Sequence, residues 1–182
     1  MQRLFPLLTL LLLFSLCTCD RAHETTAPKV TTFFDLNGYM NAEIERLTEG
    51  KVKADKSITL NGKTERKEET DINYANDLRV FREADINKPA WAEKYATDEQ
   101  KLSGSHKITT YTTLDSNLIV QQLVIEEDQG VPVKIEIDRK TGTVLSNGRH
   151  ELVYQPGKGY SVTTIQDNRF GDDVDAVISV VW

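Results

Sequence analysis

The chain of 182 residues is poor in cysteine: it has two, Cys17 and Cys19, and none from residue 20 onward. Residues 20–182 therefore hold no disulfide and no thiol nucleophile. No Asn-x-Ser/Thr sequence occurs, which argues against a glycosylated secreted protein of eukaryotes. Basic residues number 22 against 28 acidic ones. This balance argues against a nucleic-acid partner, which rewards clustered lysine and arginine, and against adhesion to an anionic lipid surface.

The chain also lacks an apolar run long enough for a membrane span. Its longest run, the uncharged stretch from Leu4 to Leu16, follows Met1-Gln2-Arg3 at the N-terminus. A short basic start followed by an apolar segment is typical of a secretory signal peptide. A helix of about 13 residues spans only about 20 Å, whereas a bilayer core is roughly 30 Å thick, so a permanent span is not expected.

The end of this segment carries the most specific motif, Leu16-Cys17-Thr18-Cys19. It resembles the lipobox of bacterial lipoproteins, in which a leucine-like residue stands three places before an acylated cysteine. Thr18 stands where such motifs usually carry Gly, Ala or Ser, and Cys17 fits less well because bulky Leu16 would precede it. The resemblance implies lipid attachment, with acyl chains such as palmitate, at Cys19, and an exported protein held at a membrane of the cell envelope.

Two alternatives stay open for this motif: ordinary cleavage without a lipid, and a cysteine that stands in the apolar run by chance. Asp20 resembles an inner-membrane retention signal of some Gram-negative bacteria, so the choice between inner and outer membrane stays open. We expect a signal peptide at 1–18, a lipid anchor and polar tether at 19–31, and a single domain at 32–182. Loss of residues 1–18 removes one positive charge and shifts the net charge from −6 to −7.

A helix is expected at the start of the domain, over residues 33–48. Apolar side chains recur there at spacings of three and four, which predicts one apolar stripe made of Phe33, Leu36, Met40, Ile44 and Leu47. Thr32 with Asp35 fits a capping arrangement at the N-terminus, and Gly50 stands where a helix ends.

A hairpin is expected next, with strands at 51–60 and 63–72 joined by Asn61-Gly62. Both residues of this dipeptide tolerate a positive φ, as a type I′ turn requires. The second strand is crowded with charged side chains, which is typical of a solvated edge strand: Glu65, Arg66, Lys67, Glu68 and Glu69. A second helix is expected over 74–84, ended by residues 85–89 because the residue before a proline avoids helical angles. Trp91 and Tyr95 follow at helical spacing and are interpreted as packing anchors.

From residue 105 onward the pattern predicts antiparallel sheet. Candidate strands are 106–114, 118–127, 131–138, 143–146, 151–155, 160–166 and 174–182, with turn residues between them. The third strand alternates most clearly: Val131, Val133, Ile135 and Ile137 share one face. Short connections favour a meander of sequential neighbours, with the two helical segments on its apolar face. The expected fold class is therefore α+β, an antiparallel meander that forms an open sheet or a curved half-barrel.

The residues give no catalytic, cofactor or metal site. The histidines, His23, His106 and His150, lack the spacing of a zinc site, and Ser103-Gly104-Ser105-His106 is adjacency without triad geometry. Residues 155–160 read as a hairpin turn, because a phosphate-binding loop would need a helix after it. The acidic loop 167–175 leaves calcium binding open, although its order does not match the EF-hand register. Glu68-Glu69 and Glu126-Glu127 point to opposite faces of their strands and form no dyads.

Three functions of different classes therefore stay open. The signal and anchor motif resemble those of short, uncharacterised lipoproteins of Gram-negative bacteria, which implies a location and no activity. The leading hypothesis is a non-enzymatic binding or scaffold module at the cell envelope, with an envelope protein as its partner. Because the order of helix and meander resembles half-barrel lipoprotein carriers of the periplasm, a carrier of a lipid or other apolar ligand is the second. A hydrolase-type enzyme that uses carboxylates or His106 is the third.

Overall fold

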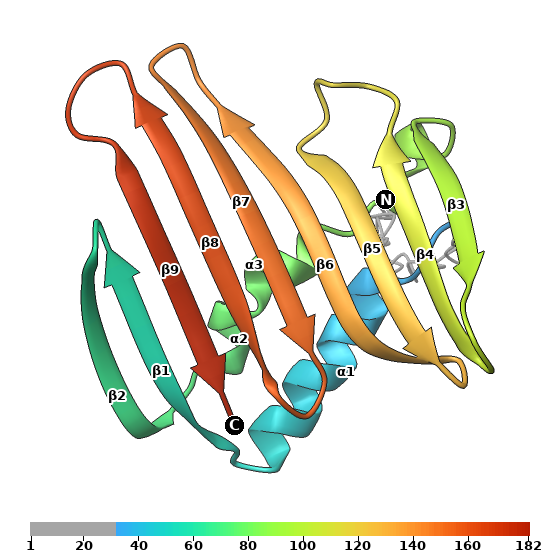
Figure 1. Ribbon diagram of the computed structural model, residues 1–182, viewed down its shortest axis with the longest axis horizontal. Helices are drawn as coiled ribbons and strands as arrows, with labels where there is room; N and C mark the ends of the chain where they lie inside the picture. The colour runs from blue at the N-terminus through green and yellow to red at the C-terminus, as the bar shows by residue number, and fades with distance from the viewer. Residues whose placement is uncertain (1–31) are drawn as a thin grey trace, which may run out of the picture. The chain divides into compact units, whose positions relative to one another are not determined.

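The structure is a computed structural model and describes residues 32–182; the signal segment, Cys19, His23 and the tether lie outside the described residues. Its main feature is a nine-stranded antiparallel sheet that does not close on itself, with helices packed on one face (Figure 1). The fold is therefore α+β, a meander with helical segments on one side, as the sequence predicts. Among residues 32–182 no helix has the length and apolar character that a membrane crossing requires.

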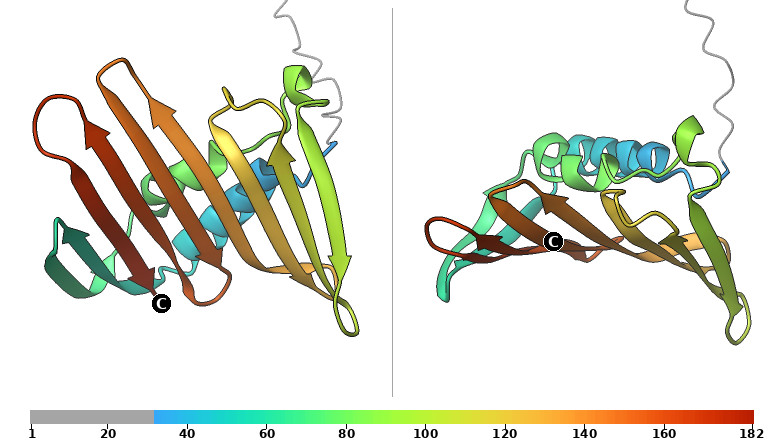
Figure 2. Two further views of the ribbon diagram at one scale, coloured as in Figure 1. Left: turned by 45° about the horizontal axis from the view of Figure 1, so that its top comes forward. Right: turned by 90° about the horizontal axis from the view of Figure 1, so that it is seen from above.

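The elements follow one another in a simple order. The helices are α1 (Leu36–Glu49), α2 (Tyr74–Asp77) and α3 (Arg79–Arg82), with a 3₁₀ turn η1 (Pro89–Trp91). The strands are β1 (Lys53–Leu60), β2 (Lys63–Asp71), β3 (Tyr95–Lys101), β4 (His106–Thr113), β5 (Val120–Asp128), β6 (Val131–Gly142), β7 (Ser146–Gln155), β8 (Gly159–Asn168) and β9 (Val174–Val181). Figure 2 shows all the helices on one side of the sheet, while the tips of the β1–β2 and β3–β4 hairpins bend toward the other side.

The strand order joins the beginning of the domain to its end. Strands β3 to β9 lie side by side in chain order, so the predicted meander is confirmed for the six predicted strands β4 to β9. The β1–β2 hairpin then continues the sheet beyond β9, where Ser57 of β1 lies opposite Ser179 of β9. Both edges of the sheet are thus polar strands, β2 and β3, which protects an open sheet from pairing with other chains.

Helix α1 confirms the predicted apolar stripe and corrects its ends. The helix begins at Leu36 because the Asp35 side chain accepts a hydrogen bond from the Gly38 N–H at 3.1 Å, so Asp35 is itself the N-cap. At the other end Gly50 remains right-handed with φ −69°, and Lys51 takes the left-handed position with φ 48°. Phe33 and the stripe residues Leu36, Met40 and Leu47 are buried, while Ile44 is partly buried.

The second predicted helix is broken into α2 and α3. Leu78, with φ −87° and ψ 1°, ends the first and precedes the second. Tyr74, Leu78 and Phe81 nevertheless face the sheet and are buried, as their spacing predicts. Asn73 starts this region, because its side chain accepts a hydrogen bond from the Asn76 N–H at 3.0 Å.

The β1–β2 hairpin is confirmed, with Asn61 at φ 47° and Gly62 at φ 80° as a type I′ turn requires. β2 is an edge strand, as its charge run predicts. The face shared by Ala54, Ile58 and Leu60 is buried only at Ala54. Ile58 and Leu60 are 41% and 51% exposed, although they lie on the same face of β1 as Ala54.

Strand β3 was not predicted: Tyr95 begins this strand, although its spacing from Trp91 is helical, and it is buried as a packing anchor should be. Only Tyr95 of this strand is buried, and the six residues after it are exposed, so the sequence of this edge strand carries no alternation of apolar residues. Tyr95 is held in the core by its hydroxyl, which donates a hydrogen bond to the Val120 carbonyl at 2.9 Å. Burial raises the pKa of Tyr95 to about 12.

The hairpin of β6 and β7 also differs from the prediction. Residues 143–145 of the expected strand 143–146 form a turn. The residues on either side of that expected strand, which the sequence suggests as turns, are paired strand residues instead, with Thr141 opposite Gly148. The Thr143 hydroxyl fixes this turn by accepting hydrogen bonds from the N–H groups of Leu145 and Ser146, both at 3.1 Å. A glycine inside a strand resembles a turn residue in the sequence. Only the pairing with the neighbouring strand shows that Gly148 belongs to β7.

The layer between the helices and the sheet is filled with side chains. Its largest fully buried members come from both layers and are Tyr154, Phe81, Leu36, Met40, Leu47, Leu78, Ile86, Leu123, Ile125, Ile135, Leu152 and Val120. The predicted alternation of β6 holds at Ile135 and Ile137, which are buried, whereas Val131 and Val133 are exposed. This dense core fixes which face of every strand is covered, and so defines the opposite face.

Candidate functional site

The face of the sheet opposite the helices, here called the open face, is not covered by any helix of residues 32–182 (Figure 2). Successive side chains of a strand point to opposite faces. In β7, Leu152 and Tyr154 are fully buried under the helices, so Val153 between them lies on the open face. The same alternation, carried through the pairing register, assigns one face to each residue of the neighbouring strands.

A group of uncharged, small side chains lies at the centre of three adjacent strands of the open face. We call it the neutral band; it consists of Ser57 and Thr59 of β1, Val177 and Ser179 of β9, and Ser161 and Thr163 of β8. Ser57 lies opposite Ser179, and Ser179 lies opposite Ser161, so three serines form one row across the sheet. All six side chains are partly buried. They carry no charge, so covering them avoids the large cost of dehydrating an ion, although their hydroxyls need hydrogen-bond partners when buried.

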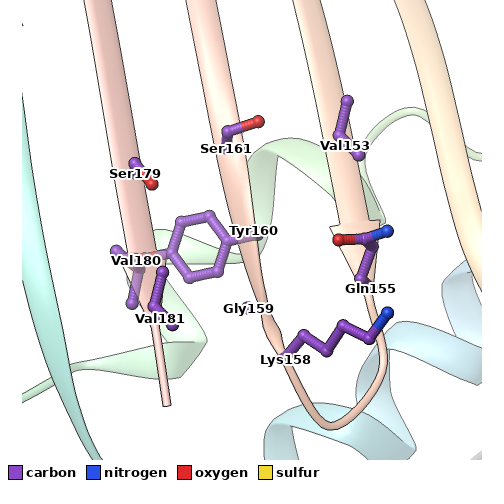
Figure 3. Close-up of a pocket in the computed structure, with 9 residues that line it drawn as sticks. All are labelled: Val153, Gln155, Lys158, Gly159, Tyr160, Ser161, Ser179, Val180 and Val181. Atoms are coloured by element: carbon purple, nitrogen blue, oxygen red, sulfur yellow. The ribbon is translucent and has the colours of Figure 1, made fainter.

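A shallow hollow of about 260 Å³ lies at one end of this band (Figure 3). Val153, Ser161, Ser179 and Val181 line it, and its floor is the backbone of Gly159. Gly159 has φ 147°, and a Cβ atom there would lie 2.0 Å from the Val180 carbonyl oxygen. The floor can therefore be only glycine, since any side chain would push the two strands apart.

On the β7 side, the neutral band is bordered by charges of both signs. Arg149 binds Asp138 through two hydrogen bonds of 3.1 and 2.9 Å, and it also lies 3.3 Å from Glu151. Lys134 and Glu136 form a further pair at 2.8 Å. Such partly exposed pairs contribute little to stability. They do give this border a defined pattern of charge, and a surface of complementary charge would recognise it.

On the other side the border is the edge strand β2. Arg66 lies opposite Ser57 in the ladder, and Arg66 and Glu68 line a second hollow of about 310 Å³ together with Ser179 and Val181. Within residues 32–182 neither Arg66 nor Glu68 forms an ion pair. The open face thus has an uncharged centre between two borders of mixed charge.

Short hydrogen bonds and an ion pair between the sheet and the helices lie on the other side of the sheet. Tyr160 donates a hydrogen bond to Asp77 at 2.6 Å, and Lys56 lies 2.6 Å from the same carboxylate. Tyr154 likewise donates to Glu43. Burial raises the pKa of both tyrosines, and their carboxylate partners raise it further, so both hydroxyls stay protonated. These contacts fasten α1 and α2 to the sheet, which is a structural role.

A second polar cluster lies beside α3. The Arg139 guanidinium donates to the Val80 carbonyl at 3.1 Å, and burial lowers its pKa. His150, opposite Arg139 in the ladder, has one hydroxyl at each ring nitrogen: Thr164 at 3.0 Å and Thr141 at 3.1 Å. Burial lowers the pKa of His150, and the charge of Arg139 lowers it further, so the imidazole is neutral at pH 7. Two hydroxyls and a cation do not activate a nucleophile.

Of the residues that the sequence singled out for chemistry, Ser105 and His106 are neighbours but bind different carboxylates. His106 binds Glu126 at 2.7 Å across β4 and β5, while Ser105 donates to Asp128 instead of to His106. Residues 155–160 form the β7–β8 hairpin turn, as predicted. In the acidic loop, the Asp173 carboxylate accepts the Asn168 N–H at 2.8 Å. Over residues 32–182 no three His, Cys, Asp or Glu side chains converge as metal ligands.

No protein-family model, no curated protein and no solved structure matches the chain.

Sequence reasoning missed the neutral band. Its residues stand at alternate positions in three strands, and each pair could be read as the wet face of its own strand. What the sequence does not show is that β1 pairs with β9, because Ser57 and Ser179 are far apart in the chain. The signal that was available is the lack of charge at these positions in a chain otherwise rich in charged residues.

Proposed function

We propose that the protein is a lipid-anchored module of the cell envelope that binds a partner without catalysis, and that the open face is its binding surface. The observation that carries the proposal is the neutral band, an uncharged surface between borders of mixed charge. The solvated face of an antiparallel sheet is polar as a rule. On this open face the charged residues lie at the borders, and the centre carries small uncharged side chains that leave room for contact.

The anchoring part of the proposal depends on the sequence motif that ends in Cys19. A tether of about a dozen residues reaches at most about 40 Å when extended, so a module at residues 32–182 would work close to the membrane surface. The polar composition of residues 20–31 supports such a tether.

The carrier alternative gains no support from the layer between helices and sheet, because large side chains fill it. A carrier would have to move the helices, which Tyr160 and Tyr154 fasten to the sheet through Asp77 and Glu43. No observation favours the enzyme alternative, because the polar pairs Tyr154–Glu43 and Tyr160–Asp77 already hold the helices on the sheet.

Site-specific photo-crosslinking in intact cells tests the proposed surface. A photo-crosslinking amino acid replaces Ser161 in the neutral band, and a matched variant carries it at Glu45, an exposed residue of α1. We expect a defined adduct from position 161 and none from position 45. Equal adducts, or adducts from position 45 alone, would show that the open face is not the binding surface.

A further inference from the structure

We propose that the partner of the open face is a second copy of this chain, packed sheet on sheet about a two-fold axis that runs along the strands between β8 and β9. This inference rests on the proposed function and names its partner. It follows from one row of residues that crosses six strands of the sheet.

The row is read directly from the pairing of the strands. Starting at the β2 edge, each residue lies opposite the next on the neighbouring strand, in the order Arg66, Ser57, Ser179, Ser161, Val153, Glu136. The row begins with a positive charge and ends with a negative one, and its centre is uncharged. Its midpoint falls between Ser179 and Ser161, which are the middle of the neutral band.

A two-fold axis that runs along the strands at this midpoint places the row of one copy over the row of the other in reverse order. Ser179 of one copy then faces Ser161 of the other, and Arg66 faces the other copy's Glu136. A two-fold axis across the strands would instead place Arg66 against Arg66 and Glu136 against Glu136. Opposite charges attract and like charges repel across an interface, so the charges select the axis along the strands.

The neighbouring positions agree with the same axis. Glu68 lies two residues beyond Arg66 on β2 and lines the same hollow, and Lys134 lies two residues before Glu136 on β6. Because β2 and β6 run in opposite directions in the sheet, the axis brings Glu68 of one copy to Lys134 of the other. Arg66 and Glu68 of one copy would thus face Glu136 and Lys134 of the other. The dimer would contain this set of contacts twice.

The surface has the size and shape that such packing needs. Six strands at about 4.8 Å spacing and about eight residues at about 3.3 Å give roughly 600–750 Å² per copy. A stable interface buries about 800 Å² on each side, so the open face comes close to that area. Serine, threonine and valine side chains are small, and two sheets pack face to face at about 10 Å with their strands aligned.

Charge exchange on the full-length chain tests the arrangement, with dimerisation measured by sedimentation velocity. Arg66→Glu places two carboxylates together, and Glu136→Arg places two guanidinium groups together, each twice in a dimer. We expect each single exchange to weaken dimerisation about tenfold or more. The double variant Arg66→Glu/Glu136→Arg restores opposite charges, and we expect its affinity within about threefold of the parent.

Lys67→Glu is the matched control, because Lys67 lies next to Arg66 but pairs with Lys56 of β1, which the alternation of side chains places on the helix-covered face. We expect it to dimerise like the parent. Thermal unfolding of each variant shows whether the fold is retained. A parent chain that stays monomeric, or a double variant as weak as the singles, overturns the proposed dimer.

The two proposals fail in different ways. If photo-crosslinking at Ser161 gives an adduct with another protein and none with this chain, the open face binds but the second copy is wrong. If position 161 gives no adduct of either kind, both proposals fall together.

Discussion

The two faces of the sheet receive different side chains from the same strands. In β7 and β8 the helix-covered face receives Leu152, Tyr154 and Tyr160, all buried, whereas the open face receives Val153 and Ser161, which are only partly buried. Burying one large apolar side chain contributes roughly 1.5–3 kcal/mol, so the covered face supplies the stability of the fold. The open face contributes little to stability, and the proposed contact with a partner would account for the lack of charge at its centre.

Neighbouring substitutions in β7 should show the largest difference between the faces. Leu152→Ala removes a fully buried side chain, and we expect the free energy of unfolding to fall by about 2–5 kcal/mol. Val153→Ala, one residue later on the open face, should lower it by less than about 1 kcal/mol. Urea denaturation of the two variants measures both. Similar losses from the two would mean that the open face belongs to the core, and the comparison of faces would fail.

We expect pH to have a smaller effect on the free energy of unfolding, through a histidine on the helix-covered face. The pKa of His150 is lowered in the folded protein, first by burial and then by Arg139, whereas an unfolded histidine titrates near 6.5. The unfolded chain therefore takes up a proton at a higher pH than the folded one, so this stability is present above about pH 6.5 and is lost as the pH falls toward the folded pKa.

His150→Gln removes this titration and so isolates it. We expect urea midpoints measured at pH 7.5 and 5.5 to differ more for the parent than for the variant. The same slope in both would show that the imidazole titrates normally, and that the covered face is wetter around Arg139 than the structure indicates.

The fold could be predicted from the sequence wherever a local pattern sufficed. Alternation located most of the strands from β4 to β9, Asn61-Gly62 located the first hairpin, and a spacing of three and four located α1. Local patterns failed at β3, where a polar edge strand buries only Tyr95, and at Gly148, which is a strand residue that resembles a turn. In both places hydrogen bonding to a neighbouring strand decides the conformation, and the local sequence does not show which strands pair.

The candidate site could not be predicted, because it is assembled by long-range pairing. The row from Arg66 to Glu136 needs five strand pairings, one of which joins β1 to β9 across most of the domain. The one site residue that the sequence did suggest, Cys19, lies outside the described residues and stays a prediction.

The most direct test of the central claim is the accessibility of the open face inside the cell. Ser179→Cys and Glu45→Cys place one thiol in the neutral band and one on the exposed side of α1, and labelling by a membrane-impermeant maleimide is read at each site by peptide mass spectrometry. Rates in intact cells are divided by rates for the dilute purified chain. We predict that position 179 is protected at least about tenfold in cells while position 45 is not. Equal ratios at the two positions would contradict a binding role for the open face.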